Sequence, residues 1–308
     1  MILENVLSCF DGISCGRVAL NRAGIGIKNY YSSEIDKHAS AITRYNYPDT
    51  IHLGDISKLT KNELPESVDL LMGGFPCQGF SSAGQKEGFE DIRSKLFFDL
   101  MKVKENVKPK YFLFENVVMK EKDLNMITNL CGVEPIILNS KYFSAQSRNR
   151  VYWTNIGTNK NGLLGDFLLN EIKEPDIDHK DLLIDILEEK VDAKYQLSES
   201  LLSHFISKTA DSSTGFSFKP SDGNKKAFTL TTRNGSRVDD NFINIGNGKV
   251  RKLTPIECER LQGLPDNFTK FGIDNKGSVI KISDTQRFKT LGNGWNVPTI
   301  SYILKYLK

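Results

Sequence analysis

Short apolar runs alternate with helical patterns through the first 155 residues, and this alternation constrains the fold more than any other feature. Four runs are typical of buried strands, over residues 6–10, 68–72, 111–114 and 133–138. Apolar residues at helical spacing fill intervening stretches such as residues 96–107. Strands that alternate with helices form βαβ units, which predicts an α/β fold with a mostly parallel, doubly wound sheet. Ligands bind such sheets beyond the carboxyl ends of the strands.

The composition fits a folded protein without a membrane segment. Of the 308 residues, 39% are hydrophobic and 26% are charged, which is enough to bury a core. The net charge of +3 is too small to indicate a partner. No apolar run of spanning length occurs, and residues 1–5 lack the features of a signal peptide. We therefore expect a cytoplasmic protein without membrane contact.

The cysteines and histidines indicate neither a disulfide scaffold nor a metal site. The four histidines show no ligand spacing. The five cysteines are far apart and include no C-x-x-C pair: Cys9, Cys15, Cys77, Cys131 and Cys258. This usage is typical of a reducing compartment and predicts a protein without metal.

The character of the sequence changes near residue 158. Residues 171–192 hold nine acidic and three basic residues, whereas residues 194–250 hold eight basic and five acidic ones. Clusters of Gly, Asn, Ser and Thr predict a loop-rich region with short strands. Regular structure returns at Thr254-Pro255-Ile256-Glu257, a helix start with a threonine N-cap, and a last helix is predicted over residues 297–307. We predict a larger domain of residues 1–157 plus 284–308, and a smaller one of residues 158–283.

Polar residues follow the first three strands in an order that suits an adenosine-bearing cofactor. The loop Phe10-Asp11-Gly12-Ile13-Ser14-Cys15-Gly16 offers free N–H groups, although by itself it is equally typical of a tight turn. Glu34, about 20 residues further on, is placed to bind a ribose diol. Asp55 follows the third strand and could accept from an adenine amino group.

Cys77 lies in the loop Gly73–Ser81, which two glycines and a proline make sharp and rigid. A cysteine is usually a small buried hydrophobe, and we expect this of Cys9, Cys131 and Cys258. Cys15 is expected to pack beneath the cofactor loop. Because Cys77 follows a strand at the ligand edge, we predict that it is an activated thiolate nucleophile.

Further charged residues follow the fifth strand. A carboxyl such as Glu115, at the end of an apolar strand near a thiolate, tends to have a raised pKa and could act as a general acid. Gln146, Arg148 and Arg150 would share one face of a strand, where two arginines could hold a phosphate and a pyrimidine edge. A solvated glutamate and a pair of surface arginines are the alternatives.

Together these elements resemble the DNA cytosine-5 methyltransferases along nearly the whole chain. The matching segments are 10–16, Gly74-Phe75-Pro76-Cys77-Gln78, Glu115-Asn116-Val117, Gln146-x-Arg148-x-Arg150, 251–258 and Leu291-Gly292-Asn293-Gly294. Only residues 160–248 lack a match, and they correspond to the variable target-recognition region of that family. One departure is Gly294, where the family usually has Ser or Ala. Trp295, Val297 and Pro298 resemble the eukaryotic de novo enzymes, whereas the compact size resembles phage or bacterial ones.

The resemblance implies a Rossmann-like S-adenosylmethionine-dependent methyltransferase fold with a smaller target-recognition domain. It also implies a mechanism in which Cys77 attacks C6 of a flipped-out cytosine, Glu115 donates to N3, Arg148 steadies O2 and Arg150 supports the loop. The loop of residues 81–95 would close over the base. The methyl group would come from S-adenosylmethionine, which leaves as S-adenosylhomocysteine.

The same resemblance implies the binding residues and the partners. We expect the cofactor site to include Phe10, Asp11, Gly12, Ile13, Gly16, Glu34, Ile35, Asp55, Ile56, Pro76, Leu96 and Asn293. We expect double-stranded DNA to be contacted by Ser81, Gln146, Arg233 and Arg237. Residues 228–233 are predicted as a strand that leads into a loop able to enter the major groove. We expect a monomer, either with a cognate restriction endonuclease or as an orphan enzyme.

Three other functions remain to be weighed. A tRNA cytosine-5 methyltransferase of this type would carry a Cys-Phe-Thr element, which does not occur here. A catalytically inactive DNA-binding module would be expected to lose Cys77 or Glu115, and both are present. An amino-group methyltransferase needs a different loop where Gly74-Phe75-Pro76-Cys77 stands.

Overall fold

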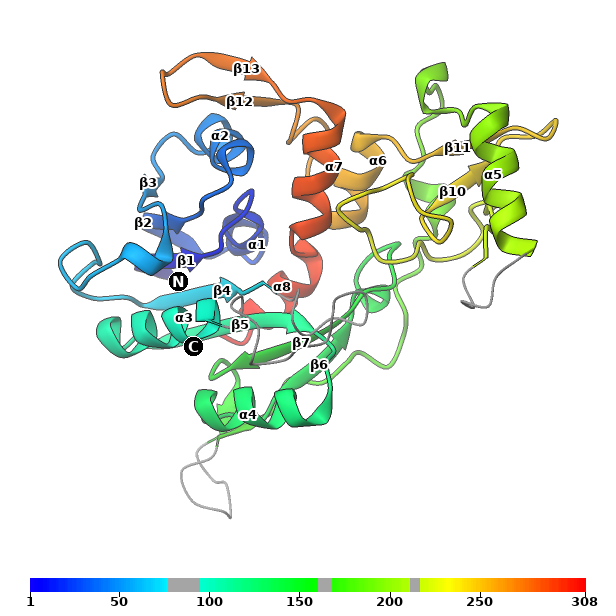
Figure 1. Ribbon diagram of the computed structural model, residues 1–308. Helices are drawn as coiled ribbons and strands as arrows, with labels where there is room; N and C mark the ends of the chain where they lie inside the picture. Colours follow the sequence, from blue (N-terminus) through cyan, green and yellow to red (C-terminus); the bar gives the residue numbers. More distant parts are fainter. Residues whose placement is uncertain (77–94, 160–167, 211–216) are drawn as a thin grey trace.

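A seven-stranded sheet lies at the centre of the protein, for which the computed structural model describes residues 1–76, 95–159, 168–210 and 217–308 (Figure 1). The strand order is β3-β2-β1-β4-β5-β7-β6. All pairs from β3 to β5 are parallel, whereas β7 is antiparallel to both of its neighbours. The predicted mostly parallel sheet is confirmed. Its strands are β1 Ile2–Cys9, β2 Gly26–Ser33, β3 Ile51–His52, β4 Leu70–Gly74, β5 Tyr111–Val117, β6 Ile136–Asn139 and β7 Asn149–Thr154.

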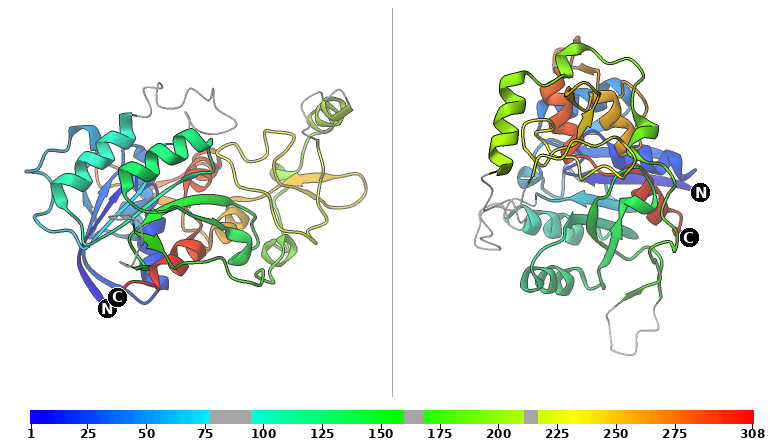
Figure 2. Two further views of the ribbon diagram at one scale, coloured as in Figure 1. Left: turned by 90° about the horizontal axis from the view of Figure 1, so that it is seen from below. Right: turned by 90° about the vertical axis from the view of Figure 1, so that its right-hand side faces the viewer.

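Helices cover both faces of the sheet because alternate residues of its strands point to opposite sides. On β1, Val6 packs in the cluster that includes α1 and α8, whereas Leu7 packs in the cluster that includes α3 and α4. Figure 2 shows the sheet between these layers. The helices are α1 Cys15–Arg22, α2 Lys37–Asn46, α3 Lys95–Val107, α4 Glu121–Cys131 and α8 Val297–Leu304.

The region between the sheet strands and α8 consists mainly of loops and short ladders, and extends away from the sheet in Figure 1. The twelve-residue helix α5, Glu199–Ala210, was not predicted. It packs through Phe205 against Phe242 and Val250. The remaining elements are β8 Thr158–Asn159, β9 Leu169–Asn170, β10 Phe242–Asn244, β11 Val250–Lys252, α6 Pro255–Gln262, β12 Phe271–Ile273, β13 Val279–Lys281 and α7 Asp284–Asn293.

Two predicted strands differ from the structure. The segment 146–150 is not one strand, because β7 begins only at Asn149. Before it, the Asn139 side chain accepts the Arg148 N–H and the Ser140 hydroxyl donates to the Gln146 carbonyl, so side chains replace a ladder. Residues 228–233 also form no strand, because the Asn241 amide binds both the N–H and the carbonyl of Phe228.

The predicted helix start at Thr254 is confirmed. The Thr254 hydroxyl accepts the Glu257 N–H, and the Glu257 carboxylate accepts the Thr254 N–H in return. Glu257 is fully buried and also pairs with Arg251 over 2.7 Å. Gly263 ends the helix at a φ of 74°.

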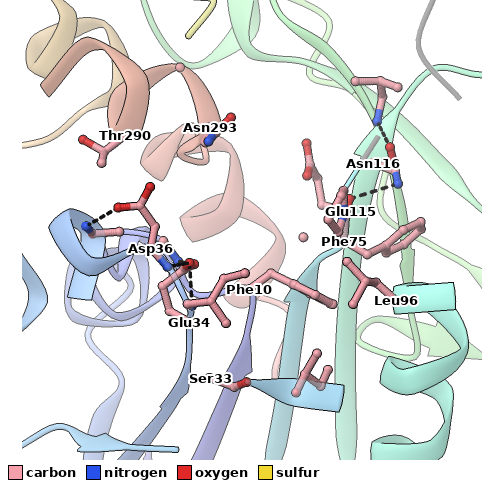
Figure 3. Close-up of a pocket in the computed structure, with 18 of the residues that line it drawn as sticks. Phe10, Ser33, Glu34, Asp36, Phe75, Leu96, Glu115, Asn116, Thr290 and Asn293 are labelled. Carbon is pink, nitrogen blue, oxygen red and sulfur yellow. Dashed lines mark hydrogen bonds between the residues drawn. The ribbon is translucent and has the colours of Figure 1, made fainter. Parts of the chain in front are cut away.

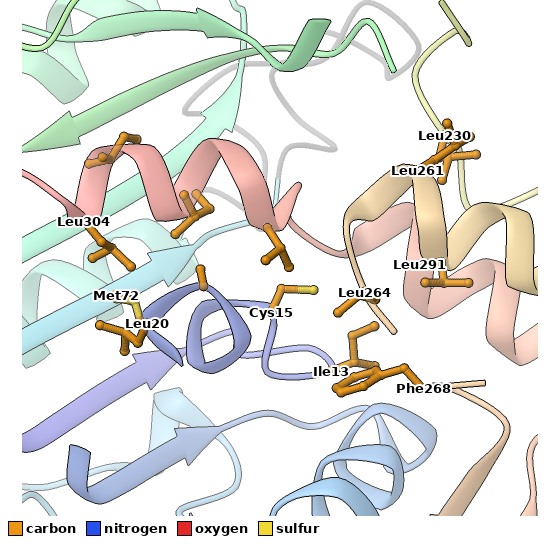
Figure 4. Close-up of a cluster of buried hydrophobic side chains, with 14 of the residues drawn as sticks. Ile13, Cys15, Leu20, Met72, Leu230, Leu261, Leu264, Phe268, Leu291 and Leu304 are labelled. Atoms are coloured by element: carbon orange, nitrogen blue, oxygen red, sulfur yellow. The ribbon is translucent and has the colours of Figure 1, made fainter. Parts of the chain in front are cut away.

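One continuous apolar core joins the sheet to α6 and α7. Figure 4 shows Ile13 and Cys15, at the start of α1, beside Leu264, Leu291 and Phe268. The loop residue Leu230 belongs to the same cluster. Among the described helices, none combines the length and the apolar character needed to cross a membrane.

Candidate active site

A cavity of about 320 Å³ opens at the carboxyl ends of the central strands (Figure 3). This volume lies in the usual range for small-molecule sites. Glu34 and Asp36 lie on one side of it, Glu115 and Asn116 on the other, and Phe10 between them. The cavity brings together most of the residues predicted for the site: Phe10, Gly12, Glu34, Ile35, Asp55, Ile56, Pro76, Leu96, Glu115, Arg148, Arg150 and Asn293.

The loop after β1 is held in an unusual backbone conformation. Phe10, Gly12 and Ser14 have φ values of 55°, 59° and 58°, a left-handed region that bulky residues rarely adopt. Asp11 fixes this turn from below, because its carboxylate accepts the Ser14 hydroxyl at 2.5 Å and the Tyr30 hydroxyl at 2.7 Å. Burial raises the pKa of Asp11, and the hydroxyl donors oppose that rise.

Three residues predicted for the cofactor site lie outside the main cavity or deeper than expected. Asp11 and Gly16 line a smaller cavity that adjoins it and shares Phe10 and Gly12. Ile13 is fully buried and packs in the core.

Glu34 ties the end of β2 to this loop. Its carboxylate accepts the N–H groups of Gly12, Ile35 and Asp36 at 2.8, 2.9 and 2.7 Å. Burial raises the pKa of Glu34. An ionised carboxylate has about four acceptor positions, so one remains for a ligand hydroxyl. The neighbouring Ile35 is 75% exposed at the rim, an apolar surface that a ligand ring would cover.

Two acidic residues close the same side of the cavity. Asp55 caps a short 3₁₀ turn, Ile56–Lys58, and the Ser57 hydroxyl and N–H lower the pKa of Asp55. Asp36 caps α2 and forms an ion pair with Lys289 of α7 over 2.7 Å. This pair joins the first part of the chain to the last at the edge of the cavity that Asp36 lines.

On the opposite side, Glu115 lies at the end of β5, directly opposite Gly74 of β4. Its side chain is 11% exposed, and Arg150 Nε contacts Oε1 at 2.9 Å. The Trp295 indole N–H donates to Oε2 at 3.1 Å. Asn116 donates to the Phe75 carbonyl at 3.2 Å and so holds the chain just before Pro76. Cys77 and Ser81, predicted as the nucleophile and a DNA contact, lie outside the described residues.

Arg148 and Arg150 have surroundings that differ from those predicted. Arg148 is buried and donates to the backbone carbonyls of Leu230, Gly292 and Gly294 at 3.1, 3.3 and 3.2 Å. Arg150, not Arg148, reaches the Glu115 carboxylate. The expectation that Arg148 contacts a base while Arg150 supports a loop therefore does not fit the geometry.

The expectation that Gln146 contacts DNA is wrong, because its side chain is fully buried. Its amide accepts the Leu230 N–H at 2.9 Å and donates to the Leu261 carbonyl at 3.2 Å. Gln146 therefore joins α6 to the segment around Leu230.

The segment 227–240 is held mainly through its main chain. The N–H and carbonyl of Ala227 pair with Ala145 and Ser147, and both backbone groups of Leu230 are bound by Gln146 and Arg148. A Cβ on Gly292 would lie 2.4 Å from the Thr231 carbonyl carbon, so only glycine permits this close approach. Asp240 accepts the N–H groups of Ser236 and Arg237 and closes the loop.

The two arginines predicted to read DNA lie on this segment. Arg233 is exposed. Arg237 is partly exposed, and its guanidinium contacts both carboxylate oxygens of Asp239 at 2.9 Å. The structure thus places both at the surface of the loop.

The buried cysteines agree with the prediction. Cys9, Cys15, Cys131 and Cys258 are all buried and free. Burial raises the pKa of Cys15 and of Cys131 to about 12, so these thiols stay protonated near neutral pH. Within the described ranges, no group of three or more His, Cys, Asp or Glu is arranged to hold a metal ion.

Several cavity residues were not singled out from the sequence. Asn116 and Gly292 lie within the motifs, so their spacing could have identified them, whereas Asp36 and Thr290 carry no such signal. The other cavity residues that were not predicted include Gly74, Phe75 and Val117, which lie within the motifs, and Ser33 and Gly54, which do not.

Comparison with known proteins places this architecture in a class. The solved structure of the Entamoeba histolytica methyltransferase EhMeth superposes with a TM-score of 0.73 at 20% identity, over 98% of this chain and 97% of that one. The chain thus shares the overall fold of that methyltransferase.

Comparison of the sequence with known proteins identifies the family. Over 97% of the chain, 34% of residues are identical to the type II methyltransferase M1.ScrFI of Lactococcus lactis subsp. cremoris, of which 76% is covered. The type II methyltransferase M.HpaII of Haemophilus parainfluenzae is 34% identical over 96% of the chain and 86% of its own length. The model of the C-5 cytosine-specific DNA methylases matches residues 5–308, and the chain belongs to this family. Its members use S-adenosylmethionine as methyl donor.

Proposed function

We propose that the chain methylates C5 of a flipped-out cytosine within a specific sequence of double-stranded DNA, through a covalent bond between Cys77 and C6. The observation that carries this proposal is the shared cavity, in which Glu34 and the glycine loop face the Glu115–Arg150 pair. A base inside a duplex cannot enter such a cavity, so the target has to leave the stack.

The residues on the Glu34 side fit an S-adenosyl cofactor. Glu34 offers a remaining acceptor to a ribose diol, and Ile35 and Leu96 offer apolar surface to an adenine. Asp55 lies where it can accept from a base amino group. When bound, S-adenosylmethionine supplies a methyl group on a sulfonium centre and leaves as S-adenosylhomocysteine.

The residues on the Glu115 side fit a pyrimidine. Attack of a Cys77 thiolate on C6 breaks the aromaticity of cytosine and makes C5 nucleophilic, with negative charge developing at N3 and O2. Glu115 then donates a proton to N3, and Arg150 stabilises O2. Once C5 carries the methyl group, a base removes the C5 proton, the Cys77–C6 bond breaks to release the thiolate, and N3 returns its proton to Glu115. The other four cysteines are buried, which leaves Cys77 as the candidate nucleophile. Arg148 keeps the backbones around Leu230, Gly292 and Gly294 in place.

We further assign DNA recognition to the domain of residues 158–283, with residues 1–157 and 284–308 as the catalytic domain. The exposed Arg233 and the neighbouring Arg237 are the proposed base-reading residues, since arginine paired to guanine is the commonest specific contact. We expect a monomer in the bacterial or phage-infected cytoplasm, either paired with a restriction endonuclease or acting alone.

The function is tested by methylating duplex DNA and tRNA in parallel with labelled cofactor. We expect transfer to DNA alone, and bisulfite sequencing of DNA from a methylation-free host should show one recurring site. Transfer to tRNA alone would establish the tRNA alternative, and transfer to neither would indicate an inactive binding module.

Arg233→Ala is expected to relax the sequence preference at one position of the methylated site. Bisulfite sequencing of DNA from a host that expresses this variant measures the preference. An unchanged site preference would show that Arg233 does not read a base.

Replacing Glu34 by alanine is expected to weaken S-adenosylmethionine binding by about 10- to 100-fold, the effect of one lost hydrogen bond to a charged group. Isothermal titration calorimetry measures this, with exposed Glu66→Ala as the control. Because burial raises the pKa of Glu34, protonation begins at a higher pH than usual, and wild-type affinity should already fall in mildly acidic buffer. Equal affinity in both variants would contradict the assignment.

The variants Arg148→Met and Arg150→Met should distinguish a structural role of Arg148 from a catalytic role of Arg150. Arg148→Met removes the arginine donor from three backbone carbonyls, of which that of Gly294 keeps a second donor, Gln262, and should lower the free energy of unfolding by about 1–3 kcal/mol. Arg150→Met should leave stability nearly unchanged but slow methyl transfer by about 10²-fold or more. Thermal denaturation and single-turnover rates measure both effects, and the reverse pattern would restore the prediction that Arg148 faces the base.

A further inference from the structure

Trp295 makes a contact with the catalytic carboxylate that the proposed mechanism does not use. Its indole N–H donates to Glu115 Oε2 at 3.1 Å, although the two residues are 180 positions apart in the sequence. Arg150 approaches the other oxygen, Oε1, at 2.9 Å. Two elements distant in sequence therefore hold the carboxylate from its two sides.

Glycine at position 74 makes room for the indole ring. A Cβ on Gly74 would lie only 2.6 Å from Trp295 Nε1, whereas a Cβ on Gly16 would lie in ordinary contact with the ring, 3.5 Å from Trp295 Cζ3. Gly74 pairs with Glu115 across the sheet and stands three residues before Cys77. The ring thus lies between the end of the glycine loop, at Gly16, and the end of β4, at Gly74.

The backbone on both sides of Trp295 is fixed. The Gly294 carbonyl accepts from Arg148 at 3.2 Å and from Gln262 at 3.1 Å, and the Asn296 amide donates to the Leu261 carbonyl at 3.0 Å. A Cβ on Gly294, where the family usually has Ser or Ala, would lie 3.2 Å from the sulfur of Cys15, which is a tight contact. The indole N–H is therefore a donor with little freedom to move.

We propose that Trp295 is a positioning residue that fixes the Glu115 carboxylate for the flipped base. The inference rests on the proposed role of Glu115. A carboxylate already oriented by a rigid donor does not have to reorganise when the base arrives, which lowers the barrier to proton transfer. Trp295 also lines the smaller cavity with Asp11 and Gly16. The same indole ring therefore lies beside both the glycine loop and the Glu115 carboxylate.

Trp295→Phe removes the N–H and keeps most of the ring. We expect the single-turnover methylation rate to fall by about 10- to 100-fold, with KM for DNA nearly unchanged. The chain provides a matched control, because its other tryptophan, Trp153, donates its indole N–H to Thr128 at 2.9 Å in the core. Trp153→Phe should leave the rate within about twofold. Equal losses in both variants would overturn the proposal.

A double-mutant cycle shows whether Trp295 acts through Glu115. In the Glu115→Ala background, Trp295→Phe should change the residual rate by less than about twofold, because the acceptor is gone. A full additional loss there would indicate a structural role and overturn the proposal. Gly74→Ala offers a second route, since its methyl group should push the indole N–H away from Glu115 while Trp295 is retained. It should slow the reaction as Trp295→Phe does and show the same non-additivity.

Fluorescence tests the contact without any activity. Trp153→Phe leaves Trp295 as the only tryptophan, so its emission reports the surroundings of the indole. We expect Glu115→Ala to change the intensity or the emission maximum, and an unchanged spectrum would overturn the contact. If the spectrum changes while the wild type methylates no DNA, the proposed function fails and the contact stands.

Discussion

Replacing Cys77 by serine is expected to abolish methyl transfer while leaving the binding of DNA and of S-adenosylmethionine intact. An alkoxide is far harder to form near neutral pH than a thiolate, so the attack on C6 cannot occur at a useful rate. The loss should be on the order of 10⁴-fold or more, the scale at which removal of a nucleophile acts. Transfer of labelled methyl groups to duplex DNA measures it.

A covalent trap distinguishes loss of the nucleophile from loss of the fold. Duplex DNA containing 5-fluorocytosine should form a stable adduct with the wild type, because fluorine cannot leave as a proton does. Cys77→Ser should form none. Buried Cys131→Ser is the matched control, and it should still be trapped. Equal trapping of wild type and Cys77→Ser would show that the nucleophile lies elsewhere.

Glu115→Gln is expected to slow the chemical step by about 10²- to 10⁴-fold with little change in cofactor affinity. The amide cannot deliver a proton to N3. Arg150 and Trp295 both donate to the carboxylate. The NH₂ group of the amide would therefore face one of these donors and lose that hydrogen bond. Single-turnover methylation under saturating DNA measures the effect.

Glu121→Gln, an exposed carboxylate in the first turn of α4, is the control for this substitution and should react at the wild-type rate. Thermal denaturation of Glu115→Gln shows whether the amide disturbs the fold. A rate near that of the wild type would remove Glu115 from the mechanism.

The periodicity of the sequence was sufficient to predict the elements that depend on local signals. The strands around residues 6–10 and 111–114, the helix of residues 96–107 and the capped start of α6 all occur where predicted. Each is determined by apolar spacing or by a cap within a few residues. The strand ends then placed Glu34, Asp55 and Glu115 around one cavity.

The errors concern residues whose partners are far away in the sequence. Gln146 was assigned to DNA, yet its partners are Leu230 and Leu261, 84 and 115 residues away. Arg148 was predicted to contact a base, yet it donates to the carbonyls of residues that lie 82 to 146 positions further along the sequence. Spacing along a predicted strand carries no information on such contacts. Motif membership identified these residues as important without showing what they touch.

The main-chain attachment of residues 227–232 has a consequence for how such enzymes diversify. Ala145, Gln146, Ser147 and Arg148 bind the N–H and carbonyl groups of Ala227 and Leu230, which every amino acid other than proline provides. The framework therefore holds this segment through groups that do not depend on side-chain identity, and it constrains the buried side chains of Ala227 and Leu230 but not those of exposed residues such as Phe228 and Thr232. If the proposed recognition role of this segment holds, replacement of its exposed residues would create a new target sequence while the cavity is inherited unchanged.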